Sequence, residues 1–269
     1  MTLARRTSLS LFGAGLCLIL AFAPGLNPFV GAAERFNLDV AIAGGATYIS
    51  LRAINAALST AQEIELGGSV VITGNLKPLK WLEPVDDTVE RVAGVIFGVA
   101  VLTGVLSISM GPVSAVGFLL VAIGLLGRCG CDALFRRGSA LPARLARGLK
   151  GCNALGLGIA VGLPVSFALG AWVGDALTHS TWVEADATLG RIAAEARTLI
   201  GEPGSGGGDP GWRETLTAYL GAAGTFWNEA DELLQASLTL VGVFVLRTVI
   251  LPVLVLLALW KILRSLTEV

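Results

Sequence analysis

Residues 92–127 read VAGVIFGVAVLTGVLSISMGPVSAVGFLLVAIGLLG, a stretch of 36 residues without a charged side chain. A helix needs about 20 apolar residues to cross the hydrocarbon core of a bilayer, and soluble domains rarely contain so long an uncharged stretch. Two further apolar stretches run from Cys152 to Gly174 and from about Val241 to Trp260. The sequence therefore predicts an all-α, polytopic helical membrane protein.

The composition agrees with this class and limits the partners. Of the 269 residues, 54% are hydrophobic and 14% are charged, and the net charge is −1. Binding to nucleic acid requires a concentrated basic surface, which this charge balance does not supply. We therefore expect the lipid bilayer and other membrane proteins as partners, and no nucleic acid. Four cysteines are too few for a disulfide-based scaffold.

Charged residues beside the apolar stretches predict the side of the membrane on which each segment lies. Residues 128–151 carry six basic residues against Asp132 alone, and Lys261 and Arg264 follow the last apolar stretch. By the positive-inside rule both segments are cytoplasmic. Residues 175–235 contain ten carboxylates and three arginines, which suits the periplasmic side. We expect a multi-pass protein of a bacterial inner membrane with a cytoplasmic C-terminus.

The uncharged stretch 92–127 is too long for one simple crossing. As a straight helix it would measure about 54 Å, against a hydrocarbon core of about 30 Å. We expect an interruption at Met110-Gly111-Pro112, because proline lacks a backbone N–H and disfavours helix in the preceding residue. The prediction is one crossing with an interfacial or re-entrant piece. Two full crossings are the alternative, and they would leave the basic segment 128–151 outside.

Residues 1–33 have the features of an N-terminal signal or anchor. Two arginines precede an apolar run from Leu9 to Ala23, and small side chains follow at residues 30–33. The run is short for a spanning helix, which favours a cleaved signal, whereas residues 26–33 would extend it into an anchor. The prediction is four spans when this segment is retained and three when it is removed.

Residues 34–91 form the first segment predicted to lie outside the membrane. Hydrophobic residues at spacings of three and four predict an amphipathic helix in its first half. These residues are Tyr48, Leu51, Ile54, Leu58 and Ala61. A short extended piece is expected at residues 67–75.

Two parts of this segment also resemble a known pattern. Residues Arg52–Ser59, followed by Leu79 and then Pro84–Arg91, are similar to a pattern in uncharacterised bacterial inner-membrane proteins. The resemblance implies a membrane protein. It carries no activity, substrate or site residue with it.

Residues 176–236 are predicted to form a periplasmic helical hairpin. Two hydrophobic seams at spacings of three and four flank a glycine-rich linker at residues 202–210. The seams consist of Trp182, Ala185, Leu189, Ile192, Ala196 and Leu199, and of Leu216, Leu220, Ala223, Trp227, Ala230 and Leu234. The hairpin would stand on the third span, residues 152–175, and on the last span and tail, residues 237–269. Two helices lying separately on the membrane surface are the alternative.

Small residues recur every four positions along the third span. They are Ala154, Gly158, Gly162, Ser166, Gly170 and Gly174. Small side chains let a second helix backbone approach closely in a bilayer, so we expect this span to pack on protein. Gly94 and Gly98 repeat the spacing in the second span. Glycine is also frequent in membrane helices without such a role, which is the alternative explanation.

Arg247 lies within the last apolar stretch. A charge at the centre of a membrane helix costs about 2.5 to 3.5 kcal/mol on insertion scales. Either its side chain extends to the membrane surface, or it faces protein or water and pairs with a carboxylate such as Asp175 or Glu90. Pro252 is expected to bend the same helix.

Three groups of residues with chemical potential are better explained by structural roles. They are Asp86, Asp87 and Glu90, then Cys129, Cys131 and Cys152, and finally His179. Carboxylates in the first turn of a helix complement its dipole. The cysteine spacing is not a zinc pattern, and the histidine has no nucleophile motif beside it. We predict no catalytic, cofactor-binding or metal-binding residue.

Two classes of function remain. The first is a homo-oligomeric structural or channel-like assembly, in which Arg247 lines a pore or stabilises an interface. The second is an accessory subunit that docks its periplasmic helices on a larger envelope or transport complex. An enzyme is not expected, because the sequence has no phosphate loop, metalloprotease motif, nucleophile elbow or cofactor fingerprint.

Overall fold

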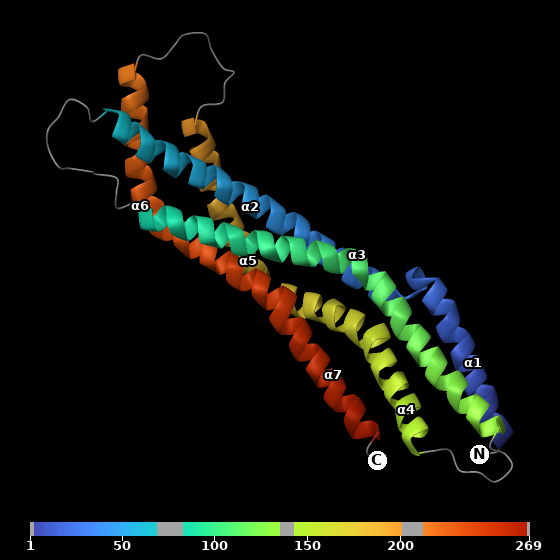
Figure 1. Ribbon diagram of the computed structural model, residues 1–269. Coiled ribbons are helices and arrows are strands. Elements are labelled where there is room, and N and C mark those ends of the chain that lie inside the picture. Colours follow the sequence, from blue (N-terminus) through green and yellow to red (C-terminus); the bar gives the residue numbers. More distant parts are fainter. Residues whose placement is uncertain (1–2, 69–82, 135–142, 201–211, 268–269) are drawn as a thin grey trace. The chain divides into compact units, whose positions relative to one another are not determined.

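The computed structural model describes residues 3–68, 83–134, 143–200 and 212–267, and these are almost entirely helical (Figure 1). The described residues contain no strand, which confirms the all-α class. The extended piece expected at residues 67–75 falls almost wholly outside the described residues, and so does the linker at residues 202–210.

The described residues form four long helical segments, and short π-helical turns interrupt two of them. The elements are α1 (Leu3–Phe22), the 3-10 turn η1 (Pro24–Leu26), α2 (Pro28–Gly68), α3 (Glu83–Leu134), α4 (Ala143–Leu157), the π turn η5 (Gly158–Gly162), α5 (Leu163–Ile200), α6 (Trp212–Val245), the π turn η6 (Leu246–Ile250) and α7 (Leu251–Thr267). The described residues include three helices that are long and apolar enough to cross a membrane. These run over Pro84–Cys131, Arg144–Arg197 and Glu229–Ile262, and the stretch Thr7–Phe22 of α1 is a shorter apolar helix. The prediction of a multi-pass helical membrane protein is confirmed to this extent.

The interruption expected at Met110-Gly111-Pro112 is wrong. Helix α3 continues through Pro112 from Glu83 to Leu134, so neither a re-entrant turn nor a second crossing begins at this proline. The interfacial piece stays a prediction. Proline is tolerated inside membrane helices, and here the turns on both sides of Pro112 are held by tertiary contacts. Here Gly111 is buried against Pro24 and Glu34, and the Ser107 hydroxyl donates a hydrogen bond to the Glu34 carbonyl at 2.9 Å. The sequence contains the proline but not these contacts.

The chain divides into two compact units. Unit 1 consists of residues 1–39, 103–175 and 247–269, and unit 2 consists of residues 40–102 and 176–246. The uncharged stretch 92–127 is therefore shared between them.

In unit 1, α1 and the start of α2 pack on α3 and on the segment from η5 into α5. Ala21, Phe118 and Ala160 form one buried cluster, and Ala33, Met110 and Phe167 form another. The N-terminal end of α1, the C-terminal ends of α3 and α7, and the start of α4 all lie at one end of this unit (Figure 1). Exposed basic side chains gather there, namely Arg128, Arg144, Arg147, Lys150 and Lys261.

In unit 2, parts of α2, α3, α5 and α6 form a helical bundle. The predicted stripe that begins at Tyr48 is part of its core as far as Leu58, because Leu51, Ile54 and Leu58 are buried. The first predicted seam is also buried at Ala185, Leu189, Ile192 and Ala196. In α6 the buried large side chains include Leu233, Leu240 and Phe244, whereas Leu234 of the predicted seam is half-buried. The positions of that seam before Ala230 have no described side chains.

Candidate functional site around Arg247

Arg247 lies in η6, where the regular helix is interrupted. Its side chain is only 14% exposed, and its Nη2 lies 3.4 Å from Oδ1 of Asp175. Pro252 lacks the N–H that would bond to the Thr248 carbonyl in an α-helix, and a π turn lies at this position. π turns inside α-helices occur frequently at functional sites.

Glycines of the third span make room for Arg247 and Pro252. A Cβ atom added at Gly174 would lie 2.9 Å from Cγ of Arg247, and one added at Gly170 would lie 3.1 Å from Cγ of Pro252. At Gly162 the nearest atom is Cδ1 of Leu256, at 3.7 Å. The last span of the same chain is therefore what this row of glycines packs against, as close approach of small residues in a bilayer would require.

The other three members of the row behave differently, and Ala154 among them is exposed. Ser166 is buried, and its hydroxyl donates to the Leu163 carbonyl of its own helix at 2.7 Å. A Cβ atom added at Gly158 would meet no described atom within 4 Å. The third span therefore packs on the last span from Gly162 onward, and not at Gly158.

Of the two carboxylates expected near Arg247, Asp175 is the one that pairs with it. Its side chain is 63% exposed, so the pair reaches the surface of unit 1. Glu90 instead lies 3.8 Å from Arg52 within unit 2. About 13 residues, or about 20 Å of helix, separate Arg247 from Trp260, so the pair is far from the basic end of unit 1.

The remaining candidates lie at other positions along the helices. Asp86 and Asp87 lie in the first turns of α3, as expected for carboxylates at a helix start, and His179 is exposed on α5. The cysteines are free thiols. Among the described residues, no group of three or more His, Cys, Asp and Glu side chains could hold a metal ion.

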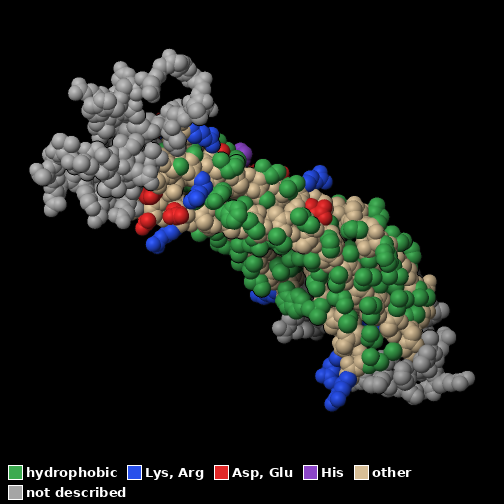
Figure 2. Space-filling view, turned by 45° about the horizontal axis from the view of Figure 1, so that its top comes forward, with side chains coloured by type: hydrophobic (Ala, Val, Ile, Leu, Met, Phe, Trp, Pro, Cys, Tyr) green, Lys and Arg blue, Asp and Glu red, His purple; other side chains and the backbone are tan. Residues whose placement is uncertain are grey.

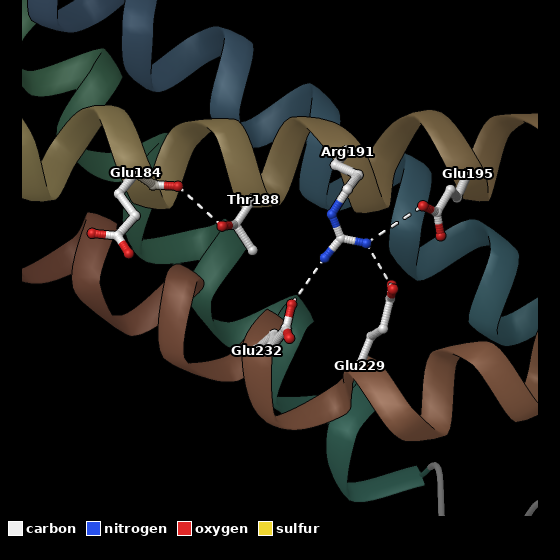
Figure 3. A network of polar contacts seen from close by, with 6 residues as sticks. All are labelled: Glu184, Thr188, Arg191, Glu195, Glu229 and Glu232. Carbon is white, nitrogen blue, oxygen red and sulfur yellow. Dashed lines mark hydrogen bonds and ion pairs between the residues drawn. The ribbon is translucent and has the colours of Figure 1, made fainter.

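A second polar cluster surrounds Arg191 in unit 2, and it was not predicted from the sequence. Figure 3 shows the Arg191 guanidinium between α5 and α6, where Nη1 lies 2.6 Å from Glu229 and Nη2 lies 2.9 Å from Glu232. Glu195, one turn along α5, lies 3.4 Å away. The spacing of Arg191 and Glu195 is visible in the sequence, but the two carboxylates from α6 come close only when the helices pack.

We expect Arg191→Gln to loosen the packing of α5 on α6. The three carboxylates would then repel one another without a cation between them, and the melting temperature should fall by a few degrees at low ionic strength. Screening should remove most of the difference at about 1 M salt, where the Debye length is about 3 Å. Thermal unfolding at the two salt concentrations measures this, with Arg197→Gln on the same helix as the control. A difference that persists at high salt would contradict an ionic role.

The sequence matches no protein-family model, and comparisons with curated proteins and with solved structures return no match.

Proposed function

We propose that this chain forms a homo-oligomeric structural or channel-like assembly in a bacterial inner membrane, with neighbouring copies in contact along α3. The proposal rests on an exposed apolar stripe that runs along this helix and is longer than a bilayer is thick. The basic end of unit 1 would face the cytoplasm, in agreement with the positive-inside rule.

The stripe recurs at spacings of three and four residues, so its members share one face of α3. Each member is exposed in the single chain. They are Gly94, Gly98, Val101, Val105, Ile108, Pro112, Val116, Leu119, Ile123 and Leu126.

Lipid alone does not account for the whole stripe. Membrane helices tilt by up to about 40°, and at that angle a core of about 30 Å holds about 39 Å of helix, or about 26 residues. The uncharged stretch of α3 has 36 residues. Counted from Arg128, the residues before Leu102 extend beyond the core, and exposed apolar surface there favours a protein partner.

The excess part of the stripe also has the shape of a helix contact. Cβ atoms added at Gly94 and Gly98 would meet no described atom within 4 Å. Two glycines four residues apart form a shallow groove on which a second helix can pack closely. In the third span, Gly162, Gly170 and Gly174 are covered by the last span of the same chain, whereas this pair is open to another copy.

The mass of the purified protein tests the proposal. In detergent and in nanodiscs we expect a defined multiple of the 27.7 kDa chain by native mass spectrometry. Leucines at Gly94 and Gly98 should shift the protein to the single-chain mass without unfolding it, because they meet open space. Leucine at Gly190, an exposed helical glycine that is also open, is the control and should leave the oligomer intact.

A monomeric wild-type protein would refute self-assembly and favour the alternative function, an accessory subunit of an envelope or transport complex. The feature that supports this alternative is the acidic surface of α5 and α6 in unit 2, where Glu184, Asp186, Asp231 and Glu232 are exposed. Co-purification of a partner with a basic surface would then be expected. Conductance of the oligomer in planar bilayers distinguishes a channel from a structural assembly.

A further inference from the structure

We propose that unit 1 binds one anionic phospholipid, whose acyl chain lies in an apolar groove and whose phosphate faces basic side chains at the end of that groove. Hydrophobic side chains cover much of the surface visible in Figure 2. The groove differs from the rest of this hydrophobic surface because it is concave and because basic side chains of α4 and α7 lie beyond one of its ends.

The groove has a volume of about 450 Å³ and lies between α3, the α4–η5–α5 segment and α7. Val113, Leu155, Gly158, Leu163, Leu257 and Trp260 line it. Its volume falls within the range of about 300 to 1,000 Å³ that is usual for small-molecule sites. Because the lining is almost wholly apolar, the part of a ligand that enters must be hydrocarbon.

The groove exists because packing of the third span on the last span ends within η5, between Gly162 and Gly158. Gly170 and Gly174 lie against Pro252 and Arg247, but no described atom would lie within 4 Å of a Cβ at Gly158. Leu155, Leu257 and Trp260 are about half exposed around the opening. A single chain therefore leaves an apolar space between the third and last spans, next to α3.

Basic side chains continue the same helix faces beyond the groove. Arg144 precedes Leu155 by 11 residues and Arg147 precedes Gly158 by 11 residues, a separation of close to three full turns. On α7, Lys261 follows Leu257 by one turn. All three cations are exposed.

This arrangement matches the two ends of a phospholipid. An acyl chain would replace the missing helix contacts along Gly158, while Trp260 would lie at the depth of the headgroups, where tryptophan is enriched. The basic residues would attract an anionic headgroup more strongly than a zwitterionic one. The occupant we infer is therefore an anionic phospholipid of the leaflet at the basic end of unit 1.

Native mass spectrometry of the full-length protein with added lipid tests this inference. Phosphatidylglycerol and phosphatidylcholine with identical acyl chains are compared as probes, and we expect at least tenfold preferential retention of one phosphatidylglycerol per chain. Replacement of Arg144, Arg147 and Lys261 by glutamine should abolish this preference.

Gly158→Phe should prevent retention of both lipids, because the ring would fill the groove. Gly15→Phe on α1, where an added Cβ also meets no described atom within 4 Å, is the control and should retain the lipid. Equal retention of the two probes by the wild type, or retention unaffected by Gly158→Phe, would overturn the inference. A change in oligomer mass with Gly158→Phe, without loss of lipid, would assign the groove to a second copy and would also overturn it.

Discussion

Gly117→Ala is expected to disrupt the packing of α3 on η5 and to lower the free energy of unfolding by more than about 3 kcal/mol. A Cβ atom at Gly117 would lie 2.5 Å from the backbone nitrogen of Ala160 and 2.8 Å from its Cα. Overpacking of a core typically costs about 1 to 3 kcal/mol, and here the obstacle is backbone that no side-chain rotation can remove. Thermal or denaturant unfolding in a fixed detergent measures the loss.

The same contact includes a hydrogen bond that depends on the close approach. The Ser114 hydroxyl donates to the Ala160 carbonyl at 2.9 Å, and Pro164 has no N–H to bond to that carbonyl as in an α-helix. Separation of the helices would therefore also expose a buried acceptor, which adds to the cost.

Gly130→Ala is the matched control, because Gly130 lies on the same helix and an added Cβ there meets no described atom within 4 Å. Alanine is favoured over glycine in helices by about 1 kcal/mol, so this variant should be as stable as the wild type or slightly more so. Equal stability of the Gly117 and Gly130 variants would show that α3 does not approach η5 as closely as described.

Loss of either partner of the Arg247–Asp175 pair is expected to destabilise unit 1 by about 2 kcal/mol. Asp175→Asn removes the carboxylate 3.4 Å from a guanidinium that is largely buried. Arg247→Leu removes the charge, and also the side-chain stem that packs over Gly174. The double variant should be at least as stable as the less stable of the two single variants, because it contains neither charge of the pair and so leaves no charge without its partner.

A double-mutant cycle from unfolding curves measures the coupling between these residues, which we expect to exceed about 1 kcal/mol. The control cycle uses Arg52 and Glu90, which lie 3.8 Å apart with both side chains well exposed and should couple by less than about 0.5 kcal/mol. Additive losses at Arg247 and Asp175, or an Arg247→Leu variant with unchanged stability and assembly, would contradict a required pair.

Part of the site could be predicted because it depends on local features of the sequence, namely a charge inside an apolar stretch and small residues at a spacing of four. Asp175 was one of two carboxylates expected near Arg247, and the row from Gly158 to Gly174 was expected to pack on protein. Which carboxylate pairs, and which helix covers the glycines, depends on how α7 lies on α5. The Arg191 cluster was missed for the same reason, since Glu229 and Glu232 are about 40 residues away along the chain.

The sequence by itself determined the class of this protein, because the length of an apolar stretch and the period of its hydrophobic residues are local properties set by bilayer thickness and helix geometry. It also determined the positions of the buried stripes around Leu51 and Leu189. Only the tertiary structure decided that α3 continues through Pro112, that the last span covers Gly162, Gly170 and Gly174, and that a groove remains at Gly158. The physical reason is that each depends on which surfaces meet across helices, and small side chains permit such contacts without specifying the partner.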